Sequence, residues 1–195
     1  LIIFFNGTAN RILRSFGIEP QEELASARSA EELTALVKHS AKRGTLALET
    51  AELVERSLAF GDRRARDAMT PRSRVYALDS SDTVAELIER ARTSGHSRFP
   101  VLDTVEDAEG HTETEVRGVA HIRSVLAVPY AERATTLIGA FLQPAIVCPD
   151  SMPLDELMDD LRAGGLQMAV LIDEFDSIAG LVTLEDLVEE IVGEV

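Results

Sequence analysis

The sequence predicts an α/β (α+β) fold in which two tandem repeats pack with pseudo-twofold symmetry, preceded by a small helical connector. Two observations lead to this fold. The chain repeats its own pattern of helices and strands after residue 65, and the first 65 residues are helical in pattern. The charge changes at the same place: residues 1–65 hold nine basic and nine acidic side chains, whereas residues 66–195 hold ten and twenty-five. We therefore expect a connector at 1–65 and repeat domains at 66–130 and 131–195.

The connector is expected to consist of helices. Ser29 followed by Glu32 has the capping-box spacing of a helix start, and Gly44 ends the helix that follows. A second helix is expected at about 47–60. The chain opens with five apolar residues, 1–5, which are either the end of a membrane span or a short buried segment. No run approaches the roughly 18 apolar residues of a complete span.

The repeat is visible as a constant offset. Residues 80–103 align with residues 150–173, 70 positions later, and residues 118–120 align with residues 180–182, 62 positions later. The difference is an eight-residue insertion in the first copy, in the acidic stretch 104–115, which we expect to be an exposed hairpin loop. The expected elements are helices at about 82–93 and 153–163, strands at 99–102, 116–120, 169–172 and 178–182, and closing helices at 121–128 and 183–192. Each copy is too small to be stable alone, so the two should share a core.

The composition excludes several function classes. Lys and Arg number 19 against 34 Asp and Glu, for a net charge of −15, so a nucleic-acid partner is not expected. The single cysteine, Cys148, allows neither an intrachain disulfide nor a Cys-rich zinc module. Residues 134–195 hold thirteen acidic residues and one basic residue, Arg162. These acidic residues are either a solvated face or, around an anionic ligand, a reason for a divalent cation to screen the charge.

Thr183 and Asp186 form the clearest candidate site. Thr183 follows an expected strand and opens a helix, so its hydroxyl either caps the helix or holds a phosphate or ribose oxygen. Asp186 either favours the helix dipole or accepts hydrogen bonds from two ribose hydroxyls. The first copy has His121 and Ser124 instead, so its cleft lacks the carboxylate and is expected to be empty or weak. His121 is interpreted as a structural cap.

Three segments resemble the CorC/HlyC (hemolysin C-like) and CNNM group of magnesium and cobalt transporters: residues 67–72 (Asp-Ala-Met-Thr-Pro-Arg), 95–101 (Gly-His-Ser-Arg-Phe-Pro-Val) and 180–193. The closing Gly-hydrophobic-hydrophobic-Thr-x-x-Asp pattern is similar to that of paired CBS domains (Bateman modules) with β-α-β-β-α repeats. The resemblance covers about residues 60–195. It implies a transmembrane (DUF21-type) domain before the connector, a cell-membrane protein with this part on the cytoplasmic side, and a homodimer formed through the CBS pair.

The resemblance also implies a ligand, ATP, at Thr183 and Asp186, and the acidic excess of residues 134–195 favours Mg²⁺ bound with it. It adds contributors from the first copy: Thr70, His96, Ser97, Arg98, Phe99 and Pro100. The proline after Thr70 favours extended geometry there, which would present its hydroxyl to a base or ribose, with a plain linker turn as the alternative. The ring of His96 or Phe99 is expected to contact a purine face, or Phe99 belongs to the core. Arg98 is one of few cations placed to meet phosphates.

The leading hypothesis is a cytosolic regulatory module that binds ATP and controls a membrane magnesium or cobalt transport domain. The nucleotide would bind one arrangement of the pair better and so shift the connector. The alternatives are an adenosine-ligand sensor, or a purely structural dimerisation module, of a membrane protein that is not a transporter. The sequence contains no nucleophile elbow, P-loop or HExxH motif, so no enzyme activity is expected.

Overall fold

The computed structural model describes residues 29–106 and 112–193. These residues belong to two compact units that divide between Leu58 and Ala59. The apolar segment 1–5, interpreted above as the end of a membrane span or a buried segment, lies outside the described residues. Within the described part of the chain, no helix is both long enough and apolar enough to cross a bilayer.

The first unit confirms the two helices that the sequence predicted for the connector. α2 (Ala30–Lys42) begins at Ser29, whose side chain accepts a hydrogen bond from the Glu32 backbone N–H at 3.3 Å. It ends just before Gly44, which adopts a positive φ of 73°. α3 (Leu48–Ala59) follows, and an ion pair of 3.2 Å between Lys38 and Glu55 joins the two helices.

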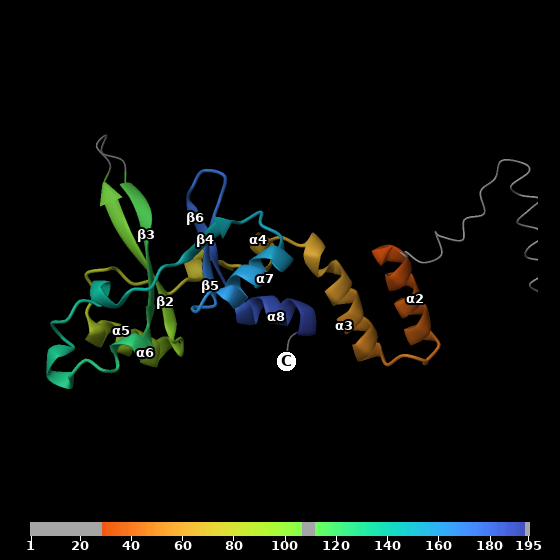
Figure 1. Ribbon diagram of the computed structural model, residues 1–195, viewed down its shortest axis with the longest axis horizontal. Coiled ribbons are helices and arrows are strands. Elements are labelled where there is room, and N and C mark those ends of the chain that lie inside the picture. The colour runs from red at the N-terminus through yellow and green to blue at the C-terminus, as the bar shows by residue number, and fades with distance from the viewer. Residues whose placement is uncertain (1–28, 107–111, 194–195) are drawn as a thin grey trace, which may run out of the picture. The chain divides into compact units, whose positions relative to one another are not determined.

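The second unit contains two sheets in the part of the chain that the structure describes (Figure 1). Four strands are ordered β1-β6-β5-β4, and a separate hairpin is formed by β2 and β3. Among the strands that the structure describes, β4–β5 is the one parallel pairing, and an isolated parallel bridge joins Leu78 to Val101. The strands are β1 (Thr70–Pro71), β2 (Arg98–Glu106), β3 (Thr112–His121), β4 (Ile146–Pro149), β5 (Met168–Ile172) and β6 (Ile178–Thr183).

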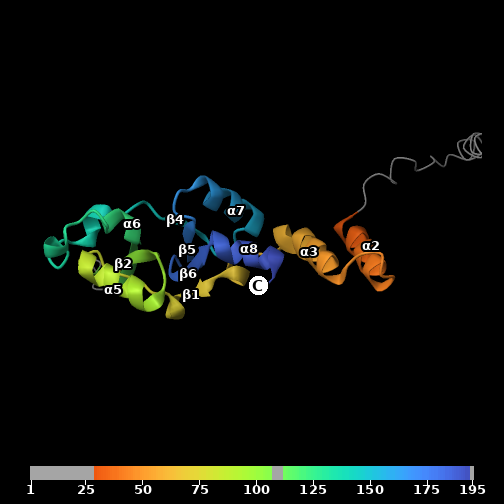
Figure 2. The same ribbon diagram turned by 90° about the horizontal axis from the view of Figure 1, so that it is seen from below.

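Helices accompany each sheet. The α-helices are α4 (Ala65–Ala68), α5 (Val84–Ser94), α6 (Ile122–Val125), α7 (Leu154–Ala163) and α8 (Leu184–Val192), and the 3-10 helices are η1 (Phe60–Asp62), η2 (Arg72–Arg74), η3 (Tyr130–Glu132) and η4 (Ile138–Phe141). α5 and α6 lie with the β2–β3 hairpin, and α7 and α8 lie with the larger sheet (Figures 1 and 2). The order α5-β2-β3-α6 therefore recurs as α7-β5-β6-α8, which confirms the predicted repeat.

In each repeat, a strand pairs with a short extended segment that precedes the other repeat, and this reciprocal pairing is what pseudo-twofold symmetry predicts. β1, which precedes the first repeat, pairs with β6 of the second, and Gln143, which precedes the second repeat, bridges to Val119 on β3 of the first. A glycine allows each approach. A Cβ on Gly180 would lie 2.3 Å from the Thr70 carbonyl oxygen, and one on Gly118 would lie 2.6 Å from the Gln143 carbonyl oxygen. No other residue fits at these positions without displacing the backbone.

Two predicted boundaries in the first repeat are wrong. The stretch 104–115 was expected to be a loop, but β2 continues to Glu106 and β3 starts at Thr112, and residues 107–111 lie outside the described part. Threonine and valine favour extended backbone, and Arg117 bridges Asp103 at 2.8 Å and Glu115 at 3.2 Å, so the ladder continues despite the acidic charge. The closing helix was expected at 121–128, but α6 ends at Val125.

Among the described residues of the second unit, buried apolar side chains form one cluster in each repeat and a third that joins them. The first-repeat cluster includes Phe99 and Leu87, and the second-repeat cluster includes Leu157 and Leu187 together with Phe60 from η1. The third cluster is formed by Val119 of the first repeat and Leu166 and Met168 of the second. The repeats thus share buried apolar surface, as their small size required.

Candidate functional site

The N-terminus of α8 is built by Thr183 and Asp186. The Thr183 backbone N–H donates to Asp186 Oδ2 at 2.7 Å, and the Thr183 hydroxyl donates to the same oxygen at 2.8 Å. The Asp186 backbone N–H donates back to Thr183 Oγ1 at 3.3 Å. This is a complete capping box, so the interpretation of Thr183 as the helix cap is confirmed, and Asp186 completes the box. Asp186 Oδ1 accepts no hydrogen bond from the residues that the structure describes, so it remains available to a ligand hydroxyl.

Thr70 lies beside the strand that leads into this helix. It pairs with Leu181 of β6, two residues before Thr183, and is half-buried there. The extended geometry predicted from Pro71 is confirmed, because both residues form β1 rather than a plain linker turn. The close contact between the Thr70 carbonyl and Gly180 fixes this segment against the second repeat.

Arg98 opens β2 in the first repeat and reaches the second repeat. Its Nη2 donates to Gln167 Oε1 at 3.3 Å, and its Nη1 lies 3.8 Å from Glu185 Oε1 at the start of α8. Only 22% of its side chain is exposed. Its Nε is buried and has no hydrogen-bond partner among the described residues. A buried N–H without an acceptor is costly, so this atom favours a ligand oxygen at the same place.

The neighbours of Arg98 divide between the surface and the core. His96 and Ser97 are exposed at the turn before β2, and the His96 ring lies 5.4 Å from the Tyr76 ring and 6.4 Å from the Phe99 ring. Phe99 is fully buried in the first-repeat core. The core alternative for Phe99 is therefore confirmed, because its ring has no accessible face for a purine. His96 is the exposed ring of the pair.

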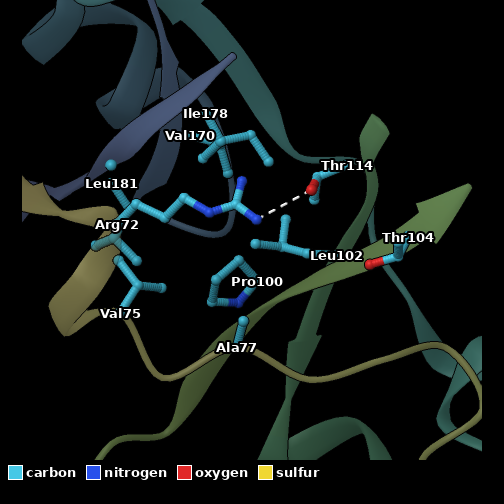
Figure 3. Close-up of a pocket in the computed structure, with 11 residues that line it drawn as sticks. Arg72, Val75, Ala77, Pro100, Leu102, Thr104, Thr114, Val170, Ile178 and Leu181 are labelled. Carbon is cyan, nitrogen blue, oxygen red and sulfur yellow. Dashed lines mark hydrogen bonds between the residues drawn. The ribbon is translucent and has the colours of Figure 1, made fainter. Parts of the chain in front are cut away.

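A cavity of about 260 Å³ continues from Pro100 along the face between the repeats (Figure 3). Its apolar walls come from β2, β5, β6 and the segment after β1: Val75, Ala77, Pro100, Leu102, Val170, Ile178 and Leu181. Arg98, Pro100 and Leu102 are alternate residues of one strand, so they share a face. The cavity and the Arg98 guanidinium therefore lie along one side of β2.

Arg72 is a cavity residue that the sequence reasoning did not assign. Figure 3 shows its side chain crossing the cavity, and its Nη2 donates to Thr114 Oγ1 at 3.0 Å. Arg72 belongs to the quoted Met-Thr-Pro-Arg segment, and that motif is the signal through which it could have been found. Thr114 could not have been found in this way, because it lies in the stretch predicted to be a loop.

The first repeat presents a different constellation at the start of α6. His121 Nδ1 accepts a hydrogen bond from the Arg123 backbone N–H at 2.9 Å, which confirms His121 as a helix cap. Burial lowers the pKa of His121, and the positive charges of Arg98 and Arg123 lower it further. In the described part of the chain, no group of three or more His, Cys, Asp or Glu side chains is arranged to hold a metal ion.

The same order of elements occurs in both repeats, and a cavity lies on the face between them. Comparison with protein families identifies this repeat pair. Residues 65–130 and 139–193 match the CBS domain family, and the chain belongs to that family.

Among curated proteins, the chain is 47% identical to UPF0053 protein MT1890 of Mycobacterium tuberculosis over 190 residues, which are 97% of this chain and 40% of that protein. It is 31% identical to the magnesium and cobalt efflux protein CorC of Escherichia coli over 168 residues, 86% of this chain and 55% of CorC. The chain is thus homologous to CorC and spans about half the length, or less, of these relatives.

Solved structures of CBS domains are also similar to this chain. The CBS domain of the bacterial CNNM/CorC family Mg²⁺ transporter is 30% identical, with a TM-score of 0.74, and the match covers 87% of this chain and 99% of that one. A structure of such a CBS domain in complex with ATP is 32% identical, with a TM-score of 0.65, and covers 74% and 97% respectively. The fold is therefore the CBS pair of the CNNM/CorC group.

Proposed function

We propose that this CBS pair binds ATP together with Mg²⁺ and regulates a membrane domain that transports magnesium or cobalt. The observation that carries the proposal is Arg98, whose buried Nε lacks an acceptor beside the capped start of α8. Arginine in such a place is suited to a phosphate, because its guanidinium offers several directed N–H donors. The Asp186 carboxylate nearby has one free oxygen for a ribose hydroxyl.

We assign the base, the ribose and the phosphates of the nucleotide to three different groups of residues. The cavity next to Pro100 is apolar and, at about 260 Å³, is smaller than the roughly 300–1,000 Å³ of pockets that enclose a whole drug-sized ligand, so it suits the base. Thr70 lies at the edge of β6 toward the base and ribose. Thr183 and Asp186 hold the ribose, and Arg98 meets the phosphates, with His96 and Ser97 at the exposed rim.

We expect Mg²⁺ to bind together with the phosphates of the nucleotide. The chain carries a net charge of −15, and Glu185 lies 3.8 Å from Arg98, where it competes with a phosphate for the guanidinium. The Glu185 side chain is 72% exposed and can turn into solvent at little cost. A cation bound to the phosphates reduces the remaining repulsion from the acidic second repeat.

Relatives support the larger assignment. CorC of Escherichia coli bears the name of a magnesium and cobalt efflux protein, and a structure 32% identical to this chain is a complex with ATP. By analogy, we propose that residues 1–65 connect a transmembrane domain to CBS domains at 66–130 and 131–195 on the cytoplasmic side. ATP would stabilise one arrangement of the pair and so bias the membrane domain. No catalysis is expected.

A second copy of the chain is the proposed protein partner. α8 exposes Val188 by 45% and Val192 by 49%, beside an apolar groove of about 460 Å³. An exposed apolar helix face of this kind is typical of a protein interface. We expect a homodimer that strengthens with ATP and Mg²⁺, and a monomer by light scattering at high protein concentration with both present would contradict it.

Calorimetric titration tests the nucleotide assignment. ATP, ADP and AMP are titrated into the wild-type chain with Mg²⁺ and with EDTA, at matched ionic strength because salt alone screens charge. We expect ATP to bind, and to bind more tightly with Mg²⁺. Preference for AMP or adenosine would favour an adenosine-ligand sensor, and absence of binding by all three would favour a purely structural dimerisation module.

A further inference from the structure

Three cationic or potentially cationic side chains lie at the start of β2 and of α6 in this acidic protein, and one of them, Arg98, reaches the second repeat. Arg98 and His121 face each other in register across the β2–β3 hairpin, and Arg123 follows on the first turn of α6. Arg98 is paired with His121 in the hairpin and Arg123 follows two residues after it, so both arginines lie close to His121. The chain as a whole has 34 acidic and 19 basic residues, so the grouping is unusual for its surroundings.

His121 is a hydrogen-bond donor in its neutral form. Its Nδ1 accepts the Arg123 backbone N–H at 2.9 Å, so the proton of the neutral ring is on Nε2. No hydrogen bond to Nε2 is formed by the residues that the structure describes. Burial and the two arginines lower the pKa of the ring, so the neutral form prevails at neutral pH. Nε2–H and the unpaired Arg98 Nε–H are therefore two donors without acceptors.

Arg98 lies near the starts of both α8 and α6. On one side its guanidinium approaches Glu185 and Gln167, next to Thr183, and on the other its strand position pairs with His121. The side chains of paired residues in a hairpin lie on the same face, so a ligand that begins at Asp186 and extends along Arg98 would run toward His121. The part of the ligand that reaches there must carry acceptor oxygens.

We propose that His121 recognises the terminal phosphates of the nucleotide whose ribose is bound at Asp186, and that it selects a nucleoside triphosphate over a monophosphate. The inference rests on the proposed function. It gives a reason for the difference between the repeats: threonine caps α8, whereas the corresponding histidine caps α6 and also carries a donor on its outer nitrogen. The first-repeat cleft then completes the second-repeat site rather than binding a nucleotide of its own.

The test is the substitution His121→Thr, which places the cap residue of the second repeat in the first. His121→Asn is a second variant, because asparagine also caps helices well. ATP, ADP and AMP are titrated with Mg²⁺ into each variant. We expect ATP affinity to fall about tenfold, as for a lost hydrogen bond to a charged group, and AMP affinity to stay unchanged. Ser124→Ala, one turn further along, is the matched control and should leave all three affinities unchanged.

The outcomes separate the two proposals. A wild-type chain that binds none of the three nucleotides overturns the proposed function and this inference with it. A wild-type chain that binds ATP, with His121→Thr and His121→Asn equal to it, overturns only the role of His121. Equal losses for ATP and AMP in both variants would also overturn it, because a residue that merely supports the fold affects both ligands alike.

Discussion

Replacing Asp186 with alanine separates its capping role from its proposed ligand role. The substitution removes the acceptor of two hydrogen bonds, from the Thr183 N–H at 2.7 Å and the Thr183 hydroxyl at 2.8 Å. Loss of such a cap costs about 0.5–2 kcal/mol of unfolding free energy, which a folded domain of this size tolerates. Loss of a carboxylate that accepts ribose hydroxyls costs about 1.5–3 kcal/mol of binding energy, or roughly ten- to a hundredfold in ATP affinity.

The chain offers a matched control for this variant at the start of α5. Thr83 and Glu86 form the same capping box, with distances of 2.6, 2.8 and 3.3 Å, in the first repeat and away from the proposed ligand. Glu86→Ala should lower stability in the same sense as Asp186→Ala and leave ATP affinity unchanged. Denaturant unfolding and calorimetric titration of both variants provide the two readouts. The reasoning is refuted if Asp186→Ala binds ATP like the parent, or if both variants lose affinity equally.

Further predictions concern stability and reactivity. Phe60→Ala removes a ring that is 7% exposed in the second-repeat core and should cost about 3–5 kcal/mol, so an unchanged denaturant midpoint would contradict its packing. Gly180→Ala places a Cβ 2.3 Å from the Thr70 carbonyl oxygen. The resulting strain should lower the free energy of unfolding by about 1–3 kcal/mol and weaken ATP binding. A variant as stable as the parent would show that β1 does not lie beside Gly180. Burial raises the pKa of Cys148 to about 11, so the thiol stays protonated at pH 8 and should react with iodoacetamide slowly until the chain is denatured, whereas rapid labelling of the folded protein, followed by mass spectrometry, would contradict this.

The sequence was sufficient for features that depend on local pattern. The 70-residue offset predicted the order of elements in both repeats, because helical and extended periodicities recur together. Thr183 was predicted to open a helix, since a threonine that follows a strand and precedes an acidic first turn is a local signal. The requirement for glycine at position 180 could not be predicted locally, because it comes from the Thr70 carbonyl, which lies 110 residues away in sequence.

Other features were decided by tertiary contacts. The residues of 104–106 and 112–115 are acidic and polar enough to suggest a loop, but pairing between the two strands keeps them extended. The sequence around Phe99 is the same whether its ring lies in a binding site or in the core. Its packing in the first-repeat cluster shows that it belongs to the core. Arg72 became a candidate only in the folded structure, where its side chain crosses the cavity and donates a hydrogen bond to Thr114.

The central claim is that the nucleotide lies between Asp186 and Arg98. A crystal structure of the chain grown with ATP and Mg²⁺ tests it most directly. The account predicts a ribose hydroxyl at hydrogen-bond distance, about 2.5–3.0 Å, from Asp186 Oδ1, and phosphate oxygens against the Arg98 guanidinium. ATP bound elsewhere on the molecule, or held only at Ser124 in the first repeat with Asp186 and Arg98 as they are without ligand, would contradict it.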